Sequence, residues 1–172
     1  PDILHDDKFG DQAKRVFDDG QKLLHQMVEE NLLIANGVVG IFPAQSRDDD
    51  IIAESPNGSY LLHNLRQQVD RGSEKPAMCL SDFIAPENFG IQDWIGAFAV
   101  STGFGIEKIA EKFKSNNDDY SAIMIKILAD RLAEAFAEHL HELVRRDFWG
   151  YSSDESLNID QMIQEEYRGI RP

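Results

Sequence analysis

The sequence has very little cysteine and lacks a long hydrophobic run. Its single cysteine, Cys79, excludes an internal disulfide framework and favours a reducing, cytoplasmic setting. No stretch is long and apolar enough to span a bilayer, and the first residues do not form a signal peptide. Basic residues are also scarce, because 17 Lys and Arg stand against 31 Asp and Glu, a net charge of −14. This charge argues against nucleic acid or an anionic membrane as the main partner.

The 172 residues are enough for one domain, and its predicted strands lie between residues 38 and 100. A buried strand at residues 38–42 is expected to stop at Pro43, and a hairpin is expected at residues 51–63 around Ser-Pro-Asn-Gly-Ser. Residues 79–84 suit a short strand or an extended segment. The apolar run at residues 94–100 suits a central strand.

Helical spacing dominates the rest of the chain. The predicted helices cover residues 11–30, 106–114, 118–146 and 159–167, whereas residues 70–76 and 151–158 are expected to be loops. Because strands come first and long helices late, without regular alternation, the predicted class is α+β, with an antiparallel sheet covered by helices.

The helix predicted at residues 118–146 is the best specified element. Asn117 or Asp118 can cap it, and Arg145 and Arg146 lie at its end, as the helix dipole favours. Its predicted apolar face comprises Tyr120, Ile123, Met124, Ile127, Leu132, Phe136, His139, Leu140 and Leu143. Acidic residues recur every four positions along another face, at Asp130, Glu134, Glu138 and Glu142.

That acidic row has two interpretations. Arg131 can pair with Glu134, and Glu142 with Arg145 or Arg146, which would make it a solvated face. Alternatively, a carboxylate there could hold an ammonium or sulfonium cation, or the hydroxyls of a ribose.

Other chemical motifs are weak. Gly103-Phe104-Gly105 lacks the third glycine of a dinucleotide loop. His139 and His141 are two positions apart and project from different sides of a helix, so we expect a half-buried His139 and no metal site. The run Asp48 to Asp50 suits a solvated turn better than a calcium loop.

Several segments together, in order and over the whole length, resemble one family. They are Gly37–Ala44, Asp49–Ile51, Leu65–Gln68, Cys79–Pro86, Ile95–Val100, Asp118–Tyr120, Ala129–Glu138 and Tyr167–Pro172. The series resembles the activation domain of cobalamin-dependent methionine synthase, a methyltransferase that makes methionine from homocysteine and methyltetrahydrofolate.

The resemblance implies a reactivating role. In the family, occasional oxidation leaves the inactive cob(II)alamin form of the cofactor. The activation domain binds S-adenosylmethionine and presents its methyl group to cob(I)alamin, which forms when flavodoxin or a flavoprotein reductase supplies one electron. The implied partners are therefore that electron donor and the separate domain that holds cobalamin, and the protein contributes mainly by positioning the methyl donor.

The resemblance also implies site residues, none of them catalytic and none a metal ligand. Glu134 matches a glutamate that contacts S-adenosylmethionine, and Arg171 matches an arginine suited to grip the ligand's carboxylate. Asp130 matches an aspartate that meets the cobalt-ligand histidine of the cobalamin domain after the histidine leaves the metal. Glu107 is expected to assist Asp130.

The chain departs from the family at its ends. In the family, Ile-Arg-Pro continues into Ala-Pro-Gly-Tyr and a further helical and sheet segment, and a ligand-contacting aspartate lies upstream of the position of Pro1. We therefore expect residues 1–172 to be a single domain that lacks the C-terminal part of the family domain, and to be inactive alone. One alternative is a non-enzymatic acidic module that docks on a cobalamin domain or flavoprotein. Another is an unrelated metal-dependent hydrolase that uses the helix carboxylates.

Overall fold

The computed structural model describes residues 2–69 and 76–169, which form two compact units. The helical unit consists of residues 1–38 and 99–172, and the sheet unit of residues 39–98. The polar loop predicted at residues 70–76 falls almost wholly outside the described residues, and the assignment of residues 1–172 to a single domain stays a prediction. Within the described ranges, no helix has the length and hydrophobicity needed to cross a membrane.

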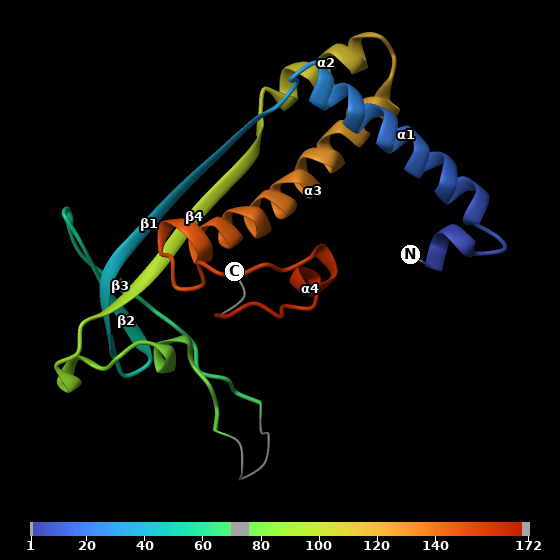
Figure 1. Cartoon of the computed structure of the whole chain (residues 1–172). Coiled ribbons are helices and arrows are strands. Elements are labelled where there is room, and N and C mark those ends of the chain that lie inside the picture. The colour runs from blue at the N-terminus through green and yellow to red at the C-terminus, as the bar shows by residue number, and fades with distance from the viewer. Residues whose placement is uncertain (1, 70–75, 170–172) are drawn as a thin grey trace. The chain divides into compact units, whose positions relative to one another are not determined.

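Four strands form an antiparallel sheet in the order β3-β2-β1-β4 (Figure 1). The strands are β1 (Ile34–Arg47), β2 (Asp50–Ser55), β3 (Gly58–Leu62) and β4 (Asp93–Phe104). The predicted hairpin is confirmed, because β2 and β3 pair antiparallel with Ala53 opposite Tyr60. A second tight turn joins β1 to β2, and Asp48 adopts a φ of 54° there. The predicted class, α+β with an antiparallel sheet and flanking helices, is confirmed.

Two predictions about the strands are wrong: where β1 ends, and where β4 lies in the sheet. Pro43 lies inside β1 rather than at its end, just before the paired segment with β2 that begins at Ala44. β4 lies at an edge of the sheet rather than in its centre. An apolar run alone therefore did not reveal whether a strand has neighbours on both sides.

The segment at residues 79–84 contains a 3₁₀ turn, Leu80–Phe83, instead of a strand. Local hydrogen bonds explain the difference, because the Asp82 carboxylate accepts from the backbone N–H of Cys79 at 2.8 Å. A short acidic side chain that binds the backbone three residues earlier favours a turn over an extended chain.

The helices are α1 (Gly10–Glu29), α2 (Ile106–Ser115), α3 (Asp119–Leu143) and α4 (Ile159–Ile163). The long predicted helix is confirmed as α3, which Asp118 caps by accepting from the backbone N–H of Ser121 at 2.9 Å. It continues into a π-helical turn, Val144–Phe148. The last helix ends at Ile163, four residues before the predicted end at Tyr167.

The hydrophobic core of the helical unit lies where α1, α2 and α3 meet. It consists of Leu23, Met27, Ile106, Ala110, Ala122, Met124, Ile125 and Ala129. Three of these residues are alanines from α2 and α3, and such small side chains let two helices approach closely. The hydroxyl of Thr102 on β4 donates to the backbone carbonyl of Ala129 at 2.6 Å, which ties the end of that strand to α3.

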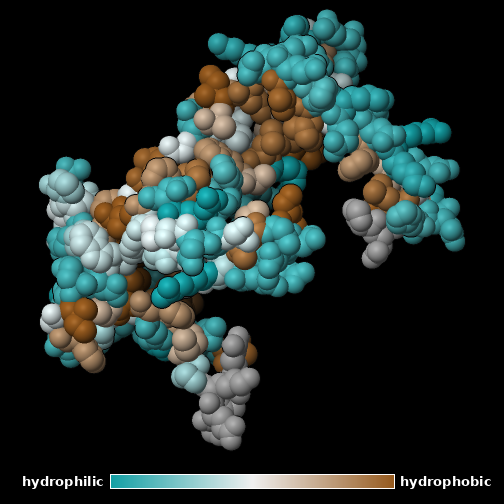
Figure 2. Space-filling model, in the orientation of Figure 1, coloured by the Kyte–Doolittle hydropathy of each residue, from teal (hydrophilic) through white to brown (hydrophobic). Residues whose placement is uncertain are grey.

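The predicted apolar face of α3 is partly wrong. Ile123 and Ile127 remain more than half exposed, whereas Ala122, Ile125 and Ala129 are buried. Helix α3 carries apolar residues on two faces, and the face that contains the alanines is the one that packs into the core. Hydrophobic surface is visible where α1, α2 and α3 meet, in the upper part of Figure 2.

Candidate functional site

Asp130 and Glu134 lie one turn apart on α3, in the helical unit. Both residues are exposed. The Glu134 carboxylate accepts from Arg131 Nη1 at 2.7 Å through its Oε2 atom, as the i,i+3 spacing predicted. Both side chains of that ion pair are about two-thirds exposed, so it costs little to rearrange when a ligand arrives.

Glu107 lies beside the same part of α3. It is in the first turn of α2, and both of its carboxylate oxygens accept from Lys126 on α3, at 3.0 and 2.9 Å. Lys126 precedes Asp130 by one helical turn, so α3 presents Lys126, Asp130 and Glu134 in succession. The packing of α2 on α3 therefore brings Glu107 next to Lys126, one turn before Asp130. The roles of Glu107, Asp130 and Glu134 as ligand contacts stay predictions.

Arg171, the fourth predicted site residue, lies outside the described residues. Its role in gripping the carboxylate of S-adenosylmethionine also stays a prediction.

The acidic row does not keep to one face of α3. A step of four residues overshoots the 3.6-residue turn by about 40°, so the row winds around the helix. Glu142 has therefore turned toward α4, and its side chain is only 22% exposed. It accepts from Arg146 Nη1 at 2.8 Å, and this hydrogen bond lowers the pKa of Glu142.

A cleft of about 360 Å³ separates the C-terminal half of α3 from α4. Acidic side chains stand at its α3 wall, and apolar side chains of α4 form the opposite wall. The lining residues are Ala135, Glu138, His139, Glu142, Ile159, Met162, Ile163 and Glu165.

The prediction that His139 is half-buried is wrong. The His139 side chain is 60% exposed and lies 3.5 Å from Glu142, whereas His141 is only 7% exposed. His141 contacts Arg145, which is 1% exposed and binds Glu155. Sequence spacing offered Arg145 or Arg146 as a partner for Glu142, and Arg146 takes that role.

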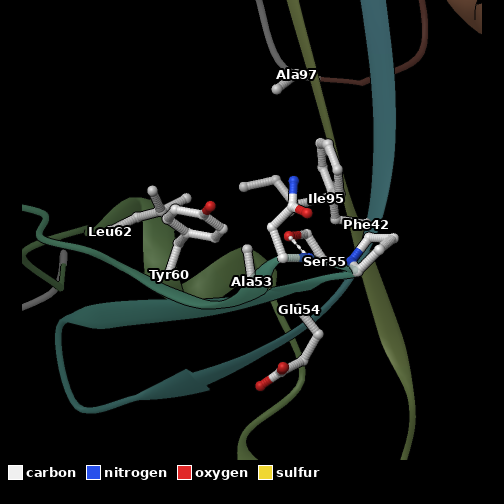
Figure 3. A pocket seen from close by; sticks show the side chains of 10 residues that line it. Phe42, Ala53, Glu54, Ser55, Tyr60, Leu62, Ile95 and Ala97 are labelled. Carbon is white, nitrogen blue, oxygen red and sulfur yellow. Dashed lines mark hydrogen bonds between the residues drawn. The ribbon is translucent and has the colours of Figure 1, made fainter.

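A second cavity, of about 430 Å³, lies in the sheet unit and is mainly apolar. Phe42, Tyr60, Leu62 and Ile95 line it, together with residues of the β2–β3 turn (Figure 3). Glu54 points away from the other labelled side chains, and its carboxylate accepts from the Ser59 hydroxyl. This cavity therefore offers an apolar surface without a charge directed into it.

Metal ligands do not gather in the described part of the chain. Within residues 2–69 and 76–169, no three His, Cys, Asp or Glu side chains are placed to hold a metal ion together. Cys79 is buried and its thiol lies 3.5 Å from the backbone carbonyl of Asp49.

Comparison with known proteins shows the family of the chain. Residues 1–172 match the model of a family described as "Vitamin B12 dependent methionine synthase, activation domain". Among solved structures, the chain is similar to the crystal structure of the MetH reactivation domain bound to AdoHcy, with 44% sequence identity and a TM-score of 0.88. The match covers 100% of this chain and 54% of that chain, so the chain spans about half the length of the relative.

Proposed function

The chain belongs to the family of the activation domain of vitamin B12-dependent methionine synthase, and we propose that it contributes to S-adenosylmethionine binding in the reactivation of that enzyme. The bound ligand supplies an electrophilic methyl group for transfer to the reduced cobalamin. The protein's own task is to hold that methyl donor in position.

The observation that carries the proposal is the exposed carboxylate of Glu134 on α3, one turn after the exposed Asp130. S-adenosylmethionine carries a sulfonium, an ammonium and ribose hydroxyls, all of which a carboxylate can bind. Arg131 binds the Oε2 atom of Glu134, and since a carboxylate can accept at both oxygens, Oε1 can receive a ligand. The relative bound to AdoHcy, which differs from S-adenosylmethionine by the methyl group, supports the same class of ligand.

Two further residues complete the proposed assignment. Arg171 binds the carboxylate of the ligand as a bidentate fork, for which guanidinium geometry is suited. Asp130, assisted by Glu107, accepts from the histidine that the cobalamin-binding domain releases from its metal. The proposed partners are accordingly that domain and a flavodoxin or flavoprotein reductase as the electron donor.

Binding of S-adenosylmethionine, measured by calorimetry, tests the proposal. Glu134→Gln and Arg171→Ala should each weaken binding about 10- to 100-fold, the scale of one charge-assisted hydrogen bond. Glu111→Gln is a matched control, because Glu111 also forms an exposed i,i+3 ion pair, with Lys114 on α2. This variant should bind like the unchanged chain.

The MetH reactivation domain serves as the positive control for calorimetry. If it binds and the present chain does not, residues 1–172 do not form a sufficient binding site. Unchanged affinity in both variants would contradict the site assignment. Absence of binding together with docking on a cobalamin domain would favour the non-enzymatic interaction module.

A further inference from the structure

Residues 8–17, which comprise the first turns of α1 and the two residues before them, form an exposed segment, the α1 arm. Its apolar side chains face water, because Phe9 and Phe17 are each 51% exposed and Val16 is 45% exposed. They border an open hollow of about 660 Å³. By contrast, the residues that α1 gives to the core of the helical unit come from its C-terminal half. Toward its N-terminal end, α1 points away from α3 (Figure 1).

The α1 arm is basic, although the chain as a whole carries a net charge of −14. It contains three basic side chains, Lys8, Lys14 and Arg15, and only one acidic side chain. The Lys8 ammonium lies 5.0 Å from the centre of the Phe9 ring, so positive charge borders the apolar surface. In the described part of the chain, none of these three basic residues forms an ion pair with a carboxylate. The α1 arm therefore presents cations and apolar side chains together.

The cleft between α3 and α4 has the complementary chemistry. Ile159 and Ile163 of its α4 wall are 71% and 74% exposed. On the α3 wall, Glu142 is already paired with Arg146. Glu138 is half-buried, and within residues 2–69 and 76–169 no cation forms an ion pair with it. A half-buried carboxylate beside an apolar wall favours a partner that supplies both a cation and an apolar surface.

We propose that two copies of the chain associate reciprocally, with the α1 arm of each copy in the α3–α4 cleft of the other. Val16 and Phe17 of one copy cover the apolar wall of the second copy. Lys14, one turn before Phe17 on the helix surface, meets Glu138 of the second copy. Two identical contacts related by a two-fold axis close a dimer instead of an open chain. This association does not depend on S-adenosylmethionine binding.

The net charge of the two copies opposes association, and the contact itself offsets this repulsion locally. Charges on the two copies that lie farther apart than about 8 Å, the Debye length at physiological ionic strength, are largely screened. Opposite charges in direct contact remain close enough to attract. Because the arm is short, the dimer should be weak and its fraction should rise with protein concentration. Salt weakens the attraction and the repulsion together, so charge reversal is the sharper test.

Sedimentation velocity of the unchanged chain, at concentrations up to about 1 mM, should show this rising dimer fraction. Lys14→Glu and Glu138→Lys each place like charges at both contacts of a dimer, so each variant alone should dimerise about 10-fold more weakly. An equimolar mixture of the two variants should associate as tightly as the unchanged chain. In the mixed dimer, both contacts again join opposite charges.

Apolar and charged controls accompany the test. Phe17→Ser should weaken dimerisation about 10-fold, because the arm loses its exposed aromatic ring. Its matched control is Phe89→Ser in the sheet unit, where Phe89 is 67% exposed, and this variant should dimerise like the unchanged chain. Lys112→Glu reverses an exposed charge on α2, outside both surfaces, and should have no effect.

Three results would overturn the proposal. The first is a chain that stays monomeric up to about 1 mM. The second is a dimer whose affinity is unchanged in Lys14→Glu and Glu138→Lys. The third is a mixture of these two variants that associates no more tightly than each variant alone, which is the result expected if the α1 arms of two copies pair with each other. Calorimetry of S-adenosylmethionine binding tests the proposed function separately.

Discussion

The helical unit and the sheet unit each use an arginine to join distant segments, but they place it in different surroundings. Arg145 is 1% exposed, and its carboxylate partner Glu155 is 7% exposed. In the sheet unit, Arg66 binds Asp82 and Asp49, and side-chain exposure is 32% for Arg66, 33% for Asp82 and 46% for Asp49. The Arg66 hydrogen bonds, together with a weaker contribution from the backbone of Cys79, lower the pKa of Asp82 to about 2.

This difference in burial changes what each ion pair contributes. Water can solvate Arg66 and Asp82 when their contact breaks, so the loss is small. A charge left alone in the position of Arg145 has no such compensation. We therefore expect an arginine–carboxylate pair to tolerate substitution in the sheet unit and not in the helical unit.

The largest expected effect comes from removing the partner of the buried arginine. Glu155→Gln should lower the free energy of unfolding by about 3–5 kcal/mol, because the Arg145 charge stays buried without a counterion. Urea unfolding monitored by circular dichroism measures the change. Glu87→Gln, which removes the exposed partner of Arg47, is the control and should shift the midpoint much less. Equal shifts in the two variants would contradict the contrast between the units.

A smaller loss of stability is expected when the pH is lowered, because His141 becomes protonated. Burial, and then the positive charge of Arg145, lower its pKa to about 4 in the folded protein against 6.5 in the unfolded chain, so between these values the unfolded state binds more protons. Stability should consequently fall as the pH drops from 6.5 to 4, by up to about 3 kcal/mol, and this contribution should level off below 4.

The pH effect can be assigned by substitution. His141→Asn keeps an oxygen that accepts from Arg145 and cannot be protonated, so urea midpoints of this variant should lack the His141 component between pH 6.5 and 4. Asp82 acts in a different range, because its folded pKa of about 2 means that its stabilisation is lost only below its ordinary pKa of 3.8. A His141→Asn profile identical to that of the unchanged chain would contradict the assignment.

The smallest expected effect lies in the sheet unit. Arg66→Met removes hydrogen bonds to Asp82, to Asp49 and to the backbone carbonyl of Ala77. Hydrogen exchange should accelerate at the amides of Gln67 and Cys79, while the amides of α3 keep their protection. Global unfolding should change less than in Glu155→Gln. Loss of protection throughout α3 would show that the exposed cluster supports the whole chain.

Much of the fold could be predicted because its signals are local. Asp118 before an uninterrupted helical pattern indicated the start and length of α3, and Ser-Pro-Asn-Gly-Ser indicated the β2–β3 hairpin. Which face of α3 is buried could not be predicted, because Ile123 and Ile125 are equally apolar. The choice depends on packing against α1 and α2, which contribute Leu23 and Ala110 to the core that also holds Ala122 and Ala129.

The candidate site shows the same limit. Spacing predicted the Arg131–Glu134 pair, but only resemblance to the family distinguished Glu134 and Asp130 from other surface carboxylates. Spacing could not assign Glu155 to Arg145, because the partner lies in a loop beyond a π-helical turn. The buried Arg145–Glu155 pair therefore became apparent only when the chain was folded.

The π-helical turn Val144–Phe148 has a consequence for how this chain can vary in length. A π turn holds about one residue more than an α turn, so deleting one residue would rotate the downstream chain by roughly 100°. Glu155 would then no longer meet Arg145, which lies ten positions earlier and four positions after His141. Insertions and deletions should thus be absent between these positions in sequences that keep the cluster. The fixed spacing of His141, Arg145 and Glu155 is therefore a sequence pattern by which the buried ion-pair cluster can be found in other sequences without an alignment.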